Sequence, residues 1–313
     1  MATDPTAQRA EDLSSNPVIE AVLDAPPRDI GAFAVRRALP SARRRTVGPF
    51  VFFDHLGPAV LEPGRGMDVR PHPHIGLATV TWLFDGEIWH RDSLGSSVPI
   101  RPGEVNWMIA GRGVVHSERS GDAFRARGGA IEGVQVWLAL PVADEEMEPA
   151  FEHHPAAALP ALAPRPGVRA VVVAGTAFGA RSPVGVRGPT LHVELRMEAG
   201  ATLTVDGEHE ERALYPVSGR IHVGGQPWEP RRMLVLRPGA EVEIRAEEPS
   251  LLMLIGGARL PEPRHLWWNL VSSRPERLVS AAEDWRAGRF PTVPGDDQEH
   301  IPAPKDGPAS PSR

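Results

Sequence analysis

Two short motifs carry side chains that could bind a metal ion. An H-x-H motif contains His72 and His74, and an H-x-E motif contains His116 and Glu118. Residues two apart on an extended strand point to the same face, so each motif can direct both side chains at one point. Imidazole and carboxylate groups are common ligands of divalent first-row metals. The four residues therefore predict a metal centre, provided that the fold brings the two motifs together.

The segment between the motifs has the pattern of antiparallel strands joined by tight turns. Residues 77–84 are apolar and rich in β-branched side chains, Asp85-Gly86 is a strong hairpin signal, and residues 88–92 can form the returning strand. Residues 105–109 predict a further strand ahead of the second motif. Successive hairpins can place the two ends of such a segment side by side, as the metal centre requires.

The composition predicts a soluble globular protein, and the length is sufficient for two domains. The chain has 313 residues, of which 41% are hydrophobic and 24% are charged. Its 31 glycines and 34 prolines favour short strands with abrupt turns over long helices. No apolar run reaches the length of a membrane-spanning helix, and the first residues lack the apolar region of a secretory signal. We therefore expect no membrane association.

The absence of cysteine limits the chemistry. It excludes disulfides and thiolate ligands, so any metal must be held by nitrogen and oxygen atoms, and a cytoplasmic location is the default expectation. The formal net charge of −6 argues against nucleic acid as a direct partner, because phosphate binding normally requires a basic surface.

Changes in composition along the chain predict its domain organisation. Residues 149–167 are rich in alanine and proline and predict a linker, and short strand candidates lie on both sides of it. The expected parts are an N-terminal tail over 1–28 with at most a short helix, a first β domain with the metal site over 29–148, the linker over 149–167, a second β domain without metal plus a C-terminal helix over 168–288, and a flexible tail over 289–313.

The two halves resemble one another, which predicts a duplicated domain. Residues 84–90 have a counterpart in residues 217–222, and residues 100–104 have one in residues 236–240. The second half also contains an H-x-E pair, His192 and Glu194. No histidine follows its Arg-Pro-Gly turn within the next strands, so we expect no second metal centre.

Longer motifs resemble those of the pirin family within the cupin superfamily. They are FFDHLGP, RPHPHIGLATVTWLFDGEIWHRDSLGS, IRPGEVNWMIAGRGVVHSER and GVQVWLALP, and the later WWNLVSS with its following helix resembles the bacterial branch. The resemblance implies an all-β bicupin fold of two tandem antiparallel β-barrels of the jelly-roll type, with a short C-terminal helix. It also implies an Fe(II) centre in the N-terminal barrel, with His72, His74, His116 and Glu118 as ligands. The residue types alone would equally suit Mn, Co, Ni or Zn.

The same resemblance implies a function. Several members of the family are quercetin 2,3-dioxygenases, which implies a small aromatic, flavonol-like substrate and oxidative ring opening with release of carbon monoxide. Glu118 is the one acid among the predicted ligands, so it is the candidate catalytic base. The alternative is a non-enzymatic, metal-binding regulatory protein that acts through a protein partner and uses the metal as a redox switch.

Other polar and aromatic residues near the motifs allow two interpretations. Asp54 and His55 could orient a ligand imidazole, or they could be a turn-capping aspartate and a packed histidine. We interpret His90, which follows a predicted hairpin turn, as structural. Four tryptophans are expected to fill barrel interiors, and some of them could also form the wall of a pocket: Trp82, Trp89, Trp107 and Trp137.

Overall fold

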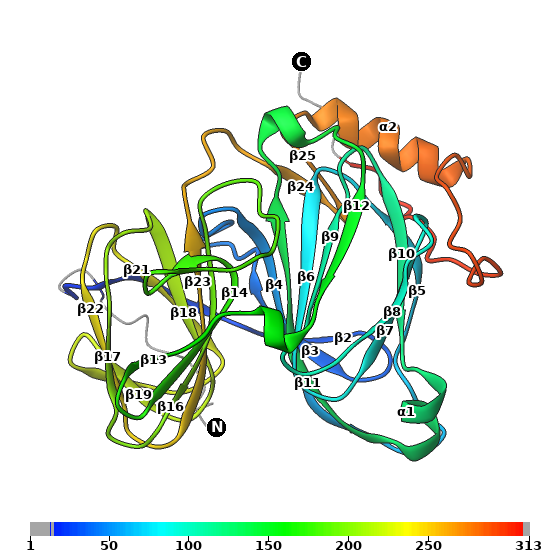
Figure 1. Ribbon diagram of the computed structural model, residues 1–313. Coiled ribbons are helices and arrows are strands. Elements are labelled where there is room, and N and C mark those ends of the chain that lie inside the picture. The colour runs from blue at the N-terminus through cyan, green and yellow to red at the C-terminus, as the bar shows by residue number, and fades with distance from the viewer. Residues whose placement is uncertain (1–12, 14–15, 309–313) are drawn as a thin grey trace, which may run out of the picture.

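The computed structural model describes residue 13 and residues 16–308. Within them the chain forms two β-barrels that lie side by side, and a helix at the end of the chain packs on the first barrel (Figure 1). The prediction of an all-β bicupin with a short C-terminal helix is therefore confirmed.

The first barrel is built from a large and a small antiparallel sheet. The large sheet has the strand order β12-β9-β6-β11-β4-β3-β2, and the small one has the order β5-β10-β7-β8. The strands are β2 (Pro27–Asp29), β3 (Ala34–Leu39), β4 (Phe50–Leu61), β5 (Asp68–His74), β6 (Leu77–Asp85), β7 (Ile88–Asp92), β8 (Ser97–Ile100), β9 (Val105–Ile109), β10 (Val114–Arg119), β11 (Gly129–Ala139) and β12 (Ala150–His154), with the short helices α1 (Asp122–Arg127) and η1 (Val142–Asp144) between them.

The second barrel repeats this plan. Its large sheet has the order β1-β21-β18-β23-β16-β14-β13, with β15 paired to β14, and its small sheet has the order β17-β22-β19-β20. The elements are β1 (Ile19–Asp24), η2 (Ala156–Ala158), β13 (Ala161–Arg165), β14 (Val168–Ala177), β15 (Ala180–Arg181), β16 (Thr190–Met197), β17 (Thr202–Val205), β18 (Glu211–Ser218), β19 (Ile221–Val223), β20 (Gln226–Trp228), β21 (Arg232–Leu236), β22 (Val242–Ala246) and β23 (Ser250–Gly257).

Comparing the two strand orders position by position gives the equivalent strands. β5 corresponds to β17, β10 to β22, β4 to β16 and β7 to β19. The turn at Asp85-Gly86 therefore has a true counterpart at Ser218-Gly219, as the sequence repeat indicates. The two Arg-Pro-Gly turns are not equivalent, because one joins β8 to β9 and the other joins β21 to β22.

The barrels exchange edge strands. β1 precedes the first barrel in the chain but pairs with β21 of the second, whereas β12 precedes the second barrel but pairs with β9 of the first. The region expected to be an N-terminal tail with at most a short helix, 1–28, thus contains the buried strand β1, in which Ile19 and Leu23 are fully buried. The predicted linker, 149–167, likewise contains β12 and β13.

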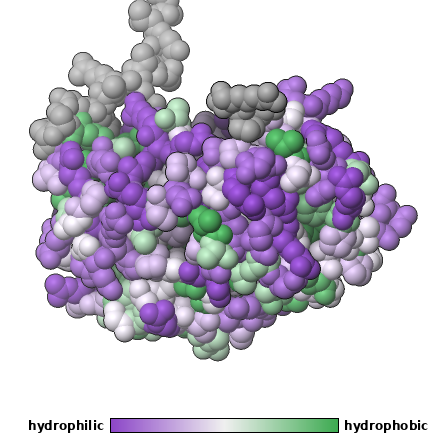
Figure 2. Space-filling view, turned by 90° about the horizontal axis from the view of Figure 1, so that it is seen from above, coloured by the Kyte–Doolittle hydropathy of each residue, from purple (hydrophilic) through white to green (hydrophobic). Residues whose placement is uncertain are grey.

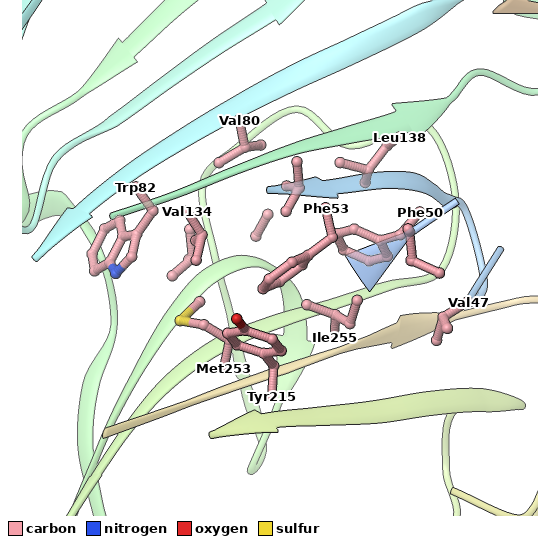
Figure 3. Packing of buried hydrophobic residues seen from close by; sticks show 14 of the residues in the cluster. Val47, Phe50, Phe53, Val80, Trp82, Val134, Leu138, Tyr215, Met253 and Ile255 are labelled. Atoms are coloured by element: carbon pink, nitrogen blue, oxygen red, sulfur yellow. The ribbon is translucent and has the colours of Figure 1, made fainter. Parts of the chain in front are cut away.

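A shared apolar core joins the two barrels. The large sheets face one another, and Phe53 and Trp82 from the first pack in one cluster with Tyr215, Met253 and Ile255 from the second (Figure 3). Phe53 and Tyr215 have ring centroids 4.7 Å apart. Burial of so many large apolar side chains indicates that the two barrels form one packed unit.

The C-terminal part of the chain returns to the first barrel. A hairpin of β24 (His265–Trp267) and β25 (Leu270–Ser272) is followed by α2 (Pro275–Arg286), whose Leu278 packs with Ile75 and Leu270. Part of the expected flexible tail, 289–313, is also packed, because the Ile301 amide donates to the Pro71 carbonyl at 2.9 Å. Residues 309–313 of that prediction lie outside the described residues.

None of the helices in the described part of the chain is long and apolar enough to cross a membrane. On the face seen from above, hydrophilic residues predominate among the described residues, and apolar residues appear in small, scattered groups (Figure 2).

Candidate metal centre

The two predicted ligand motifs lie on neighbouring strands of the small sheet of the first barrel. His72 and His74 are on β5, and His116 and Glu118 are on β10. The strands are antiparallel, with His116 paired to His72, and a register shift follows before Glu118. The strand pairing, together with the period of two along each strand, places the four side chains on one face.

The three histidines converge. One ring nitrogen from each lies within 4.8 Å of the others, and the ring centroids are 4.4–5.0 Å apart. All three side chains are buried. The structure therefore brings together the three predicted imidazole ligands, at a spacing that could hold one metal ion.

Backbone carbonyls fix the orientation of two of the rings. The Nδ1 of His72 lies 2.9 Å from the Arg70 carbonyl oxygen, and the Nδ1 of His74 lies 2.9 Å from that of Asn269. A carbonyl oxygen can only accept, so each Nδ1 must carry the proton and donate it. In the neutral rings, the Nε2 atoms then keep their lone pairs free.

Burial keeps these imidazoles neutral, the form that binds metals. It lowers the pKa of His74 and of His116 well below the usual value, and the charge of a protonated His72 would lower both further. Burial also lowers the pKa of His72, although its hydrogen bond to the Arg70 carbonyl works in the opposite direction. All three rings are thus unprotonated at neutral pH.

The arrangement of these nitrogens fits a cation. The Nε2 atoms of His74 and His116 are 3.0 Å apart. The Nδ1 of His74 carries the proton, so its Nε2 can only accept; in the tautomer of His116 that also carries its proton on Nδ1, two lone pairs face each other across this contact. A divalent ion between the rings would turn that repulsion into coordination, and neutral imidazole is a preferred ligand of Fe(II), Ni(II) and Zn(II).

Glu118 lies beside the three histidines but is not part of the group whose ligand atoms all lie within 4.8 Å of one another. The Gln135 side-chain amide donates to both of its carboxylate oxygens at 2.7 and 2.9 Å, and the Thr81 hydroxyl donates at 3.3 Å. The carboxylate is therefore held in place by neutral donors, and no cation among the described residues pairs with it at salt-bridge distance.

A cavity of about 460 Å³ opens beside His72 and Glu118. Its walls include the rings of Phe52 and Trp137, which stack with centroids 3.9 Å apart, and the ring of Trp268. The volume is within the range of pockets that bind small organic molecules. The site thus combines metal-binding nitrogens with an aromatic wall.

Comparison with known proteins agrees with this geometry. The sequence model described as pirin matches residues 32–138, and the one described as pirin C-terminal cupin domain matches residues 192–291. The chain belongs to the pirin family. A pirin-like protein of Caulobacter vibrioides is 46% identical over 92% of this chain and 100% of its own, and human pirin is 29% identical over 80% and 86%.

Comparison with solved structures also finds similar proteins. A crystal structure of quercetin 2,3-dioxygenase from Acinetobacter baumannii has a TM-score of 0.87 and 34% identity, and the match covers 95% of this chain and 98% of that one. A bacterial pirin from Escherichia coli in complex with nickel(II) has a TM-score of 0.59 at 16% identity, covering 76% and 99%, and so supports the fold alone.

In this member of the pirin family, Asp54 and His55 form their hydrogen bonds with residues other than the ligand histidines. Asp54 accepts two hydrogen bonds of 2.8 Å from the guanidinium of Arg37, and burial raises its pKa although Arg37 opposes the shift. His55 lies between the Tyr215 hydroxyl and Glu132, each at 3.2 Å. The contacts therefore favour the packed histidine for His55, whereas the turn-capping role for Asp54 is wrong, because Asp54 lies within β4 and pairs with Arg37.

Sequence reasoning missed three residues of this pirin site. Asn269 is almost two hundred positions from His74, so no local pattern links them. Gln135 lies on β11 without a recognisable motif. His90, interpreted as structural, lies with its Nδ1 3.4 Å from the Nδ1 of His116. Its H-x-D spacing with Asp92 repeats that of the ligand motifs and is the signal that could have identified it.

Segments from the end of the chain cover the pocket. Trp268 and Ile301 line it, and Trp268 adopts a left-handed backbone conformation with φ of 54° at the hairpin turn. Arg119, which follows Glu118, donates to both carboxylate oxygens of Asp296 at 2.7 and 2.8 Å. The C-terminal segment of this pirin is therefore part of the site.

Proposed function

We propose that the protein is an Fe(II)-dependent dioxygenase that opens the ring of a flavonol such as quercetin and releases carbon monoxide. The observation that carries the proposal is the convergence of three buried, neutral imidazoles beside an aromatic-walled cavity of about 460 Å³. The 34% identity to a structure named quercetin 2,3-dioxygenase supports the same chemistry.

The cavity suits a flat aromatic substrate. Trp137 and Trp268 line it with aromatic rings against which a flavonol can pack, while the ring of Phe52 stacks on Trp137 and contacts the Arg37 guanidinium, 4.3 Å from its centroid. The Trp137 indole Nε1 is buried and has no hydrogen-bond partner among the described residues. Since an unpaired buried donor is costly, a carbonyl or hydroxyl oxygen of the substrate is the partner that we assign to it.

Glu118 is the residue that we assign to proton transfer, and we also propose it as the fourth metal ligand. Bound at the three imidazoles, iron(II) would lower the pKa of a coordinated flavonol hydroxyl and supply the redox chemistry for dioxygen. The Glu118 carboxylate takes the hydroxyl proton, while the Gln135 amide and the Thr81 hydroxyl hold the carboxylate toward the cavity. The aromatic walls keep the flavonolate in place and limit access of water.

Replacing Glu118 with glutamine tests this role. Glutamine keeps the size of the side chain but cannot accept the proton, so we expect turnover to fall by at least about 100-fold, the lower range for general acid–base catalysis. The measurement is loss of quercetin absorbance and formation of carbon monoxide after air is admitted to anaerobically iron-loaded protein. Glu104→Gln, a change in the turn before β9, is the control and should retain full activity.

The same assay separates the enzyme from the alternative. Full activity of the Glu118→Gln protein would remove Glu118 from the base role. No turnover by fully iron-loaded wild-type protein with any of a panel of flavonols would overturn the dioxygenase proposal and favour the metal-binding regulatory protein.

A further inference from the structure

A third pair of polar side chains lies on the same face of the small sheet. His90 and Asp92 are two residues apart on β7, which pairs with β10 so that Asp92 lies opposite His116 and His90 lies opposite Glu118. Both are buried, Asp92 completely. A buried carboxylate is costly unless it accepts hydrogen bonds, so core packing alone does not explain why this pair lies beside the ligands.

The hydrogen bonds of this pair define where each proton lies. The Oδ2 of Asp92 is 2.9 Å from the Nε2 of His90, and a carboxylate can only accept, so Nε2 carries the proton. The Nδ1 of the neutral His90 ring is then an acceptor. It lies 3.4 Å from the Nδ1 of His116, which can donate to it. In that tautomer the Nε2 of His116 keeps its lone pair, facing the Nε2 of His74.

The surroundings prevent the pair from reorienting. The second oxygen of Asp92 accepts from the backbone N–H groups of Leu94 and Ser96 at 2.9 and 3.0 Å. The ring of His90 stacks on Phe151 with centroids 4.6 Å apart and planes within 15° of parallel. The carboxylate is thus bound at both ends, and the imidazole plane is held by an aromatic face.

We propose that His90 and Asp92 are positioning residues that fix the Nδ1–H tautomer of His116 and thereby hold its Nε2 lone pair toward the metal. The inference rests on the proposed metal centre but not on the dioxygenase reaction. His72 and His74 obtain the same tautomer from backbone carbonyls, whereas His116 obtains it from side chains alone. It is therefore the ligand whose tautomer a single substitution can reverse.

The substitution Asp92→Asn should reverse it with little change of shape. The asparagine oxygen must stay on the Leu94 and Ser96 amides, because the side-chain NH₂ cannot face two donors. The NH₂ group then points at His90, which must accept at Nε2 and carry its proton on Nδ1. His116 must accept in turn, so its own proton moves to Nε2, the nitrogen needed for the metal. An Asp→Asn change in a Ser-His-Asp triad acts through the same loss of tautomer.

The first test uses the unaltered protein. Nitrogen-15 NMR of the histidine rings, assigned with single histidine variants, reports which nitrogen carries the proton. We expect Nε2–H for His90 in both the metal-free and the Zn(II)-loaded protein, and Nδ1–H for His116 in the metal-free protein. A proton on the Nδ1 of His90 in either form, or on the Nε2 of metal-free His116, would overturn the proposal.

The second test measures metal affinity. Competition for Zn(II) against a chelator should show Asp92→Asn binding about 10–100-fold more weakly than wild type, the usual cost of removing a partner of a metal-binding histidine. The matched control is Asp85→Asn, since Asp85 also accepts a backbone N–H but lies in the exposed turn before β7. Unchanged Zn(II) affinity in folded Asp92→Asn would contradict the proposal, and both readouts are independent of flavonol turnover.

Discussion

The two barrels share one strand order, yet only the first carries ligand residues on its two metal-binding strands. The strands equivalent to β5 and β10 are β17 and β22, and neither contains a histidine. The H-x-E pair of the second barrel, His192 and Glu194, lies on β16, which is the counterpart of β4. Equal spacing of residue types therefore does not identify equivalent positions in a duplicated fold.

The surroundings of the imidazoles differ as much as their positions. Each ligand histidine of the first barrel has a partner for its outer nitrogen, whereas neither nitrogen of His192 has one among the described residues. His192 packs edge-on against Phe50, with ring centroids 5.6 Å apart. Glu194 accepts from Trp82 and Arg196. The ligand histidines and His192 thus differ in whether the outer nitrogen is bound, although a bound nitrogen alone does not identify a ligand, since both nitrogens of the packed His55 are also bound.

The largest expected effect concerns metal content. His116→Ala removes one of three converging nitrogens and should reduce bound metal from about one ion per chain to a small fraction after dialysis. His192→Leu should leave it unchanged. Elemental analysis of both proteins, purified without a polyhistidine tag, checks the contrast, and equal losses in the two variants would contradict it.

A smaller effect concerns stability and pH. Burial lowers the pKa of His192 to about 3, so between pH 6.5 and 3 the unfolded chain binds a proton that the folded protein does not. Stability is therefore lost as the pH falls through this range, by about 2 kcal/mol at pH 5. His192→Leu should remove that loss. Its free energy of unfolding should also rise by about 1–2 kcal/mol at pH 7, because a buried polar group without a partner is removed.

Denaturant unfolding of metal-free wild-type and His192→Leu proteins at pH 7 and pH 5 measures this difference. The histidines of the first barrel are present in both proteins, so their contribution to the pH dependence of stability cancels in the comparison. An equal loss of stability in the two proteins would show that His192 is not the source.

A second effect on stability, of similar size, concerns Glu194. Trp82→Phe removes the indole that donates to Glu194 at 2.8 Å across the interface of the barrels, while Arg196 still pairs with the carboxylate. We expect a loss of about 1–3 kcal/mol in the free energy of unfolding and no change in metal content. A change in Zn(II) affinity would contradict the expectation that the surroundings of Glu194 do not influence the metal centre of the first barrel.

The sequence predicts the parts of the site that depend on local spacing. His72, His74, His116 and Glu118 follow from the period of a strand, and the Asp85-Gly86 turn follows from its backbone preference. Because the bicupin resemblance rests on these same motifs, the fold class could also be predicted.

The remaining features depend on pairing between distant residues. β1 looks like a helix or a tail because its partner, β21, lies more than two hundred positions away in the other barrel. β12 looks like a linker because its composition is that of a loop, and only its pairing with β9, more than forty positions earlier, makes it a strand of the first barrel. Asn269 could not be connected with His74, and His90 needed the strand register to place it beside His116. A local sequence pattern does not reveal which barrel an edge strand will pair with.

The exchange of edge strands sets an order of events during synthesis. β1 is translated among the first residues but cannot pair until β21 has left the ribosome, and the carbonyl that orients His74 arrives later still, at Asn269. The nascent first barrel therefore has an incomplete centre for most of translation. A product that stops before the β24–β25 hairpin would carry the ligand motifs without the carbonyl that orients His74.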